Sequence, residues 1–203
     1  VMLIFAALVS LSVVHGATGI TDSETGLIYT VSGDTATVTG YDGAVTDLTI
    51  PAALGGYPVR AIGDNAFAGR TDLREVILPE GLTTIGSYAF YDCDSFQALP
   101  TLPSTLTAIG SYGFYGCDSM AELTLPDQKI TLGTYVFGNC KNLRTVTLPV
   151  DYDISSTPFG SAYTSEQTDG VTTIHFTCGE SGILPNRGTN SRYPEYYGKS
   201  LEY

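Results

Sequence analysis

The sequence predicts a β-dominated solenoid, in which short parallel strands and short helical or 3-10 turns stack behind an N-terminal β-hairpin cap. The first observation is a repeated pattern whose phenylalanines lie 23, 24 and 23 positions apart, at Phe67, Phe90, Phe114 and Phe137. The second is a proline that ends an apolar run in each repeat. The third is a composition with 23 glycines and no tryptophan, which suits many short strands and turns. A fixed period of this length indicates units that bury their apolar side against their neighbours.

The first 16 residues are predicted to be a signal peptide. From Met2 to Val14 the chain is apolar and uncharged, which matches a secretory apolar segment and is too short for a comfortable membrane span. The sequence starts at Val1, so we expect that the first few residues of this peptide are missing. A buried strand or helix is the alternative interpretation. We therefore expect a secreted or cell-surface protein whose mature chain does not enter the membrane.

Residues 17–50 are predicted to form the N-terminal cap and a linker. Two β-rich runs, 27–31 and 36–41, flank a turn around Gly33. Runs of this kind separated by a glycine-containing turn indicate a β-hairpin. Such a hairpin would cover the exposed apolar side of the first repeat.

Residues 51–150 are predicted to be the repeat array. A first strand at 45–51 leads into it, and a loop is expected at 55–58. Each later unit combines an extended piece, a tight helical turn and a strand that ends at proline, because proline cannot donate to the ladder. These prolines are Pro79, Pro103, Pro126 and Pro149.

The second repeat departs from the others because its strand contains one extra residue and Pro100. An added residue and a missing hydrogen-bond donor together predict a β-bulge. We expect this bulge to kink the sheet and to re-aim Ala98 and Thr101 relative to the neighbouring units.

The end of the chain is predicted to depart from the repeat. Residues 151–179 read as a degenerate terminal repeat, with a final strand at 171–176. An atypical last repeat is expected at the end of a solenoid. Residues 180–203 show no period and are expected to form an irregular tail.

Across residues 59–150 the pattern Leu-x-x-Ile-Gly-x-x-Ala-Phe-x-x-Cys-x-x-Leu-x-x-Val-x-Leu-Pro recurs. This pattern resembles the BspA-like class of leucine-rich repeats, which implies an α/β-type leucine-rich repeat solenoid. The resemblance implies a secreted or cell-surface protein, and this class is often implicated in adhesion to host proteins or other cells. It implies no catalysis and selects no ligand, because the pattern consists of framework positions.

Three cysteines occupy one repeat position, at Cys93, Cys117 and Cys140. We expect them to form a ladder of buried thiols, since free cysteine packs as a small apolar residue. A disulfide between two neighbours is an alternative in an exported protein, because stacked strands lie within disulfide reach. A metal site is disfavoured, because a linear ladder does not supply convergent ligands. Arg70 takes the cysteine position in the first unit.

A second ladder is expected at Tyr88, Tyr112 and Tyr135. Stacked tyrosines stabilise adjacent units by aromatic packing, which is the simpler interpretation. Tyrosine is also an economical contact residue. This stripe is therefore the second candidate binding surface.

The first candidate binding surface is the face formed by outward-pointing strand residues. Side chains alternate along a strand, so with Val76 and Leu78 inward their neighbours must point out. The predicted outward residues are Glu75, Ile77, Ala98, Thr101, Glu122, Thr124, Thr145 and Thr147. This set has no aromatic anchor or arginine cluster, so a weak or multivalent contact is favoured. The alternative is a solvated face that binds nothing.

Charge and composition disfavour several classes of partner and activity. A formal net charge of −12 disfavours nucleic acid and anionic membranes as partners. No catalytic residues, metal ligands or small-molecule cofactor are expected, because His175 has no nucleophile motif nearby and an open sheet face gives no desolvated cleft. We expect a non-enzymatic protein that binds an extracellular protein or glycan. The alternative is a spacer or display module of a larger surface protein.

Overall fold

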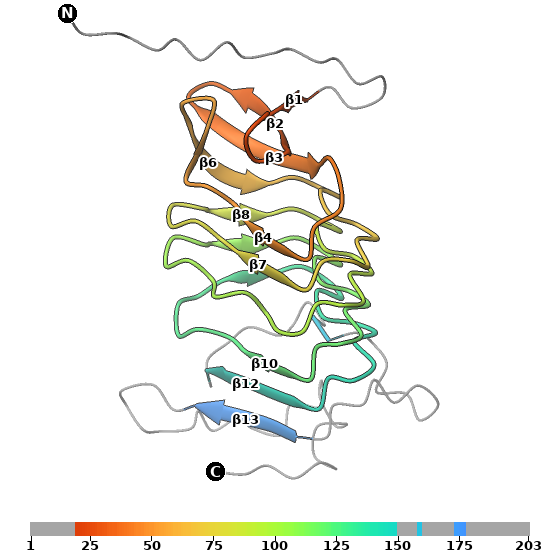
Figure 1. Ribbon diagram of the computed structural model, residues 1–203. Helices are drawn as coiled ribbons and strands as arrows, with labels where there is room; N and C mark the ends of the chain where they lie inside the picture. Colours follow the sequence, from red (N-terminus) through yellow and green to blue (C-terminus); the bar gives the residue numbers. More distant parts are fainter. Residues whose placement is uncertain (1–18, 150–157, 160–172, 178–203) are drawn as a thin grey trace, which may run out of the picture.

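The computed structural model describes residues 19–149, 158–159 and 173–177. The predicted signal peptide and the predicted tail lie outside these residues. The same holds for most of the predicted terminal repeat. The described chain is a column of stacked coils, with the hairpin at one end (Figure 1). The cap, array and tail boundaries remain predictions.

The N-terminal end is closed by antiparallel strands. Strand β1 (Ile20–Thr21) pairs with β2 (Leu27–Ser32), and β2 pairs with β3 (Thr35–Tyr41) around Gly33, whose φ is 58°. The other edge of β3 pairs in parallel with β6 (Tyr57–Ile62). The predicted hairpin is therefore confirmed, and it joins directly onto the first coil.

The loop expected at 55–58 is shorter than predicted. Strand β5 (Ala53–Leu54) pairs antiparallel with β6, and only Gly55 and Gly56 separate the two strands. Both glycines have positive φ, 58° and 88°. Positive φ at both central residues is the geometry of a two-residue type I′ hairpin turn, so Tyr57 and Pro58 already belong to β6.

One face of the column is a continuous sheet. From β6 it passes in parallel through β8 (Thr84–Ile85), β9 (Ala108–Ile109) and β11 (Thr131–Leu132). The register pairs residues one repeat apart, with Ile62 beside Ile85 and Ile85 beside Ile109. The repeat period therefore sets the strand register.

The other face is divided into two sheets. Strand β4 (Asp47–Thr49) pairs in parallel with β7 (Glu75–Ile77). Strand β10 (Glu122–Thr124) pairs in parallel with β12 (Thr145–Pro149), which pairs with β13 (Thr173–Thr177). These strands follow one another down one side of the column in Figure 1. The first strand of the array and the final strand are confirmed in parallel pairing.

The interruption lies in the second repeat, where the sequence predicts a bulge. A bulge requires a paired strand, but residues 97–103 form no strand. The bulge prediction is therefore wrong, although the irregularity is where it was expected. Pro100 has no N–H, and the extra residue puts this segment out of register with the strands on either side, so no ladder forms here.

The turns that join the two faces are not helical. Within the described ranges the structure contains no α-helix or 3-10 helix, so the predicted helical turns are wrong. A left-handed residue interrupts each turn, with φ between 56° and 59° at Asn65, Tyr88, Tyr112 and Tyr135. Right-handed helices need negative φ at successive residues, so one such residue ends any helical run.

Hydrogen bonds between coils complete these turns. The N–H of Phe67 donates to the carbonyl of Ala89 (2.8 Å), and the N–H of Phe90 donates to the carbonyl of Gly113 (2.8 Å). A helix would direct these N–H groups along its own axis. Here alternate N–H groups bond to the next coil, which adds to the cohesion between repeats.

The core is a spine of phenylalanine rings. Phe67, Phe90, Phe114 and Phe137 are buried, and successive ring centroids lie 5.2, 5.0 and 5.8 Å apart in stacked geometry. Phe159 extends the stack at 5.8 Å. Aromatic contacts at this separation stabilise beyond simple burial. The burial of each repeat's apolar side against its neighbours, which the period predicts, is therefore confirmed.

Candidate binding face and groove

The outward face carries the predicted side chains on its paired strands. In β7 Val76 is buried, whereas its neighbours Glu75 and Ile77 are exposed. In β10 Leu123 is buried between two exposed residues. Strand β12 follows the same alternation, but its outward residues are only half-buried because β12 has a partner strand on each side. The outward face contains Glu75, Ile77, Glu122, Thr124, Thr145 and Thr147.

Two predicted members of the face differ from the rest. Ala98 and Thr101 are exposed but lie in the irregular segment, outside any strand. The structure also adds two residues that sequence reasoning missed. Asp47 pairs with Glu75 and Thr49 pairs with Ile77, so β4 continues the outward face. The alternation in the run 45–51 was the signal for them.

A groove of about 520 Å³ runs along the free edge of β7. We call it the β7 groove. One wall is the continuous stretch from Arg74 to Leu78, and the other is the irregular segment from Gln97 to Thr101. Because the first wall includes outward and inward residues of β7, the groove follows the edge of the strand and not one face of it. Its volume lies in the range of small-ligand sites.

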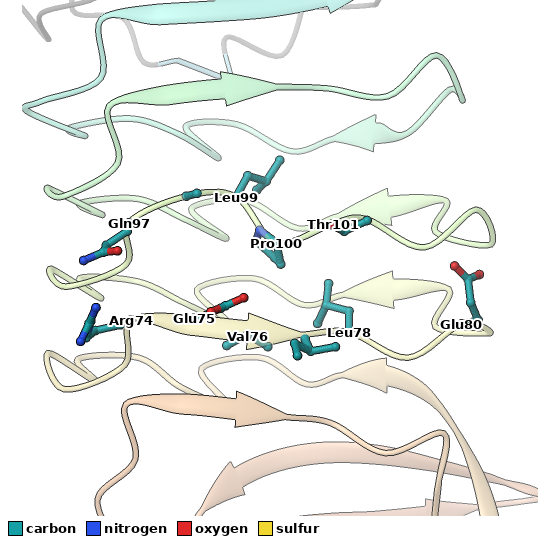
Figure 2. A pocket seen from close by; sticks show the side chains of 11 residues that line it. Arg74, Glu75, Val76, Leu78, Glu80, Gln97, Leu99, Pro100 and Thr101 are labelled. Atoms are coloured by element: carbon teal, nitrogen blue, oxygen red, sulfur yellow. The ribbon is translucent and has the colours of Figure 1, made fainter.

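Charge is distributed unevenly along the β7 groove. Arg74 and Gln97 lie together at one end, and Glu80 lies at the other (Figure 2). Glu75 lies between them on β7. Within the described part of the chain Arg74 and Glu75 make no ion pair, and Glu80 accepts a bond only from the Ser104 hydroxyl (3.3 Å). The charged groups of the groove are therefore available to a partner.

Ile77 is the apolar feature of this site. Its side chain is 56% exposed, and the only other large apolar residues exposed in the described part are Tyr57 and Tyr88. Ile77 shares the groove with the half-buried Leu99. Burying an exposed side chain of this size against a partner is favourable by about 1–2 kcal/mol.

The tyrosine stripe forms as predicted. The rings of Tyr88 and Tyr112 stack with centroids 4.8 Å apart, and those of Tyr112 and Tyr135 stack at 5.3 Å. Tyr91 and Tyr115 make a parallel stack at 5.2 Å. Neighbouring rings cover one another, so the stripe offers a partner mainly ring edges and hydroxyl groups. This geometry fits the structural interpretation of the stripe.

The cysteine ladder is buried and reduced. The thiols of Cys93, Cys117 and Cys140 donate to main-chain carbonyls of the preceding coil at 3.2, 3.4 and 3.4 Å. Burial raises the pKa of the Cys93 thiol to about 12, which keeps it protonated. The described residues contain no cluster of three or more His, Cys, Asp or Glu able to hold a metal ion. The ladder therefore packs as apolar core.

The apolar positions of the repeat pattern correspond to the buried core of the stacked coils. The family described as BspA type Leucine rich repeat region matches residues 44–174, in six copies. The chain belongs to the BspA-type leucine-rich repeat family. A search of curated proteins finds no match.

Solved structures of bacterial leucine-rich repeat proteins resemble this chain. A leucine-rich repeat protein of T. pallidum is 26% identical with a TM-score of 0.63, over 77% of this chain and 71% of that one. A leucine-rich repeat protein from Bacteroides capillosus is 28% identical with a TM-score of 0.54, over 61% of this chain and 94% of that one. A leucine rich cell surface protein from Faecalibacterium prausnitzii is 26% identical with a TM-score of 0.50, over 79% of this chain and 45% of that one.

The β7 groove was not predicted from sequence, although its position was marked by Pro100 and the extra residue of the second repeat. The BspA-type pattern describes framework positions, and the groove arises where that framework is interrupted. Among the residues that the structure describes, no helix has the length and apolar character needed to cross a bilayer.

Proposed function

We propose that this chain is an exported BspA-type leucine-rich repeat protein that binds an extracellular protein or glycan through its outward face. The observation that carries the proposal is the β7 groove, where Glu75 and the exposed Ile77 of the outward face lie beside charged side chains that make no ion pair within the described ranges. Exposed apolar side chains beside polar ones are typical of interaction sites.

Export is supported by the apolar start of the sequence and by likeness to a bacterial cell-surface protein. The net charge of −12 favours partners that are neutral or basic over nucleic acid or anionic lipid. A non-catalytic role fits a chain composed of framework repeats. Glu75 and Glu122 lie in separate sheets on an open face, which gives neither of them the desolvation that acid catalysis needs.

The test compares two substituted faces in a binding assay. One variant carries Glu75→Lys, Glu122→Lys and Thr124→Lys on the outward face, and the matched control carries Tyr88→Ser, Tyr112→Ser and Tyr135→Ser. Binding of each to immobilised extracellular matrix proteins and mucin is measured by biolayer interferometry, with circular dichroism as the check on folding.

We expect the outward-face variant to lose at least about tenfold in affinity, because three reversed or added charges act together. The tyrosine variant should bind as the parent does wherever it folds. Loss of binding in the tyrosine variant alone would move the site to the stripe. Absence of binding by the parent protein itself would favour the spacer alternative.

A further inference from the structure

The edge of β7 that faces the groove has unpaired main-chain groups. The N–H of Glu75 donates to the Thr46 carbonyl (3.1 Å), and the carbonyl of Ile77 accepts from the Ile50 N–H (3.0 Å). The main chain of these two residues therefore faces β4. In a pleated strand the groups of the intervening residues point the opposite way. The N–H and carbonyl groups of Val76 and Leu78 consequently point toward the groove.

These groups have no partner within the described part of the chain. No strand pairs with this edge of β7, and no hydrogen bond reaches the main chain of Val76 or Leu78. The two residues are only 2% and 9% exposed, so water reaches them poorly. Buried main-chain groups without a partner destabilise the fold, and a ligand that paired with them would recover this cost.

Most main-chain groups of the opposite wall also lack a hydrogen-bond partner within the described residues. The N–H of Gln97 donates to the Arg74 carbonyl (3.3 Å), and among the described residues this is the only main-chain hydrogen bond between the two walls. In the described structure no main-chain hydrogen bond is made by residues 98–102, and Pro100 has no N–H to give. A segment held so weakly can shift to admit a ligand.

We propose that the β7 groove binds an extended polypeptide segment, which adds to the free edge of β7 as an extra strand. The proposal rests on the proposed function and names its partner class. The three residues of β7 together with Leu78 span about 13 Å at 3.3 Å per residue, so the contact accepts about four residues of peptide. Strand addition of this kind takes its affinity from main-chain hydrogen bonds and its specificity from alternate side chains.

The side chains around the groove determine which types of residue the peptide would carry at each position. An apolar residue of the peptide packs on Ile77 and Leu99, a carboxylate lies near Arg74 and Gln97, and a basic residue lies near Glu80. None of the residues that line the groove is aromatic. Sugar rings favour aromatic platforms, so the groove suits a peptide better than a glycan.

The test uses the full chain labelled with nitrogen-15 and the probe acetyl-Glu-Val-Thr-Val-Lys-amide. Its reverse, acetyl-Lys-Val-Thr-Val-Glu-amide, covers the opposite strand direction. The peptide that binds is then compared with its own sequence carrying N-methyl groups on the Val and Thr nitrogens, which removes the hydrogen-bond donors and keeps the side chains. Amide chemical shifts are followed by NMR up to 5 mM peptide.

We expect one of the first two peptides to shift the amides of Val76, Leu78 and Leu99, and the N-methylated peptide to bind at least about tenfold more weakly. The variant Arg74→Glu should weaken binding about fivefold, as loss of one exposed ion pair does. Its matched control is Arg144→Glu, at the same repeat position ahead of the fully paired β12, and it should leave binding unchanged.

Three results would overturn the inference: no shift with either unmodified peptide, equal binding of the N-methylated peptide, or shifts confined to residues outside the groove. These results are separable from the wider proposal. A variant with only Glu122→Lys and Thr124→Lys leaves the groove intact and reports on the rest of the outward face. If it loses matrix binding while the peptides fail, binding through the outward face stands and strand addition does not.

Discussion

At the scale of single residues, Gly110 and its counterpart Gly133 one repeat later set how closely the coils approach. A Cβ atom built on Gly110 would lie 2.5 Å from the Ser87 nitrogen and 2.7 Å from the Gly86 carbonyl carbon. A Cβ atom on Gly133 would likewise lie 2.4 Å from the Ser111 nitrogen. Both obstacles are main chain, which cannot rotate away. The glycine is needed for space, since its φ is not left-handed.

We expect Gly110→Ala to lower the free energy of unfolding by about 3 kcal/mol, because the added methyl group pushes two coils apart. Gly40→Ala is the matched control, since a Cβ there meets its nearest neighbour at 3.6 Å, an ordinary contact. Urea denaturation followed by circular dichroism measures both. Equal stability of the two variants would show that the coils can separate without cost.

Arg70 shows why one framework position departs from cysteine. Its guanidinium pairs with Asp72 (3.0 Å), donates to the Gly43 carbonyl (2.7 Å) and lies 5.4 Å from the centre of the Tyr41 ring. Asp72 in turn accepts from the Val45 N–H (3.0 Å). These contacts hold the segment between the cap and the first strand of the array.

This ion pair predicts a pH dependence of stability. The hydrogen bond from Arg70, followed by the bond from the Val45 N–H, lowers the pKa of Asp72 to about 2. The unfolded value is about 4. The folded pKa is the lower one, so the stabilisation is full above about pH 4 and is lost as pH falls toward 2.

We expect Asp72→Asn to be less stable than the parent at pH 6 by about 1 kcal/mol or less, because the pair is partly exposed to solvent. The difference should shrink between pH 4 and pH 2. Thermal unfolding followed by circular dichroism at several pH values measures it. A difference that stayed constant across this range would assign the effect to lost packing instead of charge.

At the scale of elements, the turns explain where sequence-based prediction failed. A short run such as Ser111–Cys117 has local features that suit a helical turn, and we predicted one. The left-handed conformation of Tyr112 is stabilised by stacking between Tyr88 and Tyr135 in the neighbouring coils. This stabilisation comes from residues 23 or 24 positions away, so local propensity does not contain it.

The left-handed conformation of Tyr112 predicts that alanine and glycine substitutions there rank in stability in the reverse of their usual order. Tyr112→Gly should be more stable than Tyr112→Ala by about 1 kcal/mol, because only glycine adopts positive φ without strain. At Thr134, which is exposed and does not have positive φ, the usual order with alanine above glycine should hold. Chemical denaturation of the four variants tests this. The usual order at position 112 would contradict the left-handed turn.

The candidate site was likewise predictable from the sequence only in part. Strand alternation was sufficient to place Glu122 and Thr124 on the outward face, because alternation is a local property of an extended chain. The β7 groove needed the structure, because it depends on pairing that fails between two coils. The sequence marked the position with Pro100 but could not distinguish a bulged strand from an absent one.

At the scale of the whole molecule, the two faces of the solenoid differ in continuity. One face is a single sheet from the cap to β11, whereas the other is divided between β7 and β10. The coils still remain together across the division, because the phenylalanine spine and the turn hydrogen bonds pass through it without a break. The molecule can therefore carry a locally unpaired segment on a stable column.

This difference predicts uneven hydrogen exchange. The amides of Leu99 and Thr101 make no hydrogen bond to any residue that the structure describes, whereas those of Gly110 and Leu125 donate to carbonyls at 2.8 and 2.9 Å. We expect the first pair to exchange at least about a hundredfold faster than the second. Native-state exchange followed by NMR measures this. Comparable protection at Leu99 and Leu125 would mean that the outward face is continuous in solution.

The amino-acid sequence by itself determined the period, the buried phenylalanine and cysteine ladders, and the alternation of the paired strands. Each of these follows from side-chain chemistry repeated at a regular spacing. Only the tertiary structure decided the left-handed turns and the free edge of β7. Both depend on how one coil packs against the next. The free energy of that packing comes from contacts between residues that are distant in the sequence.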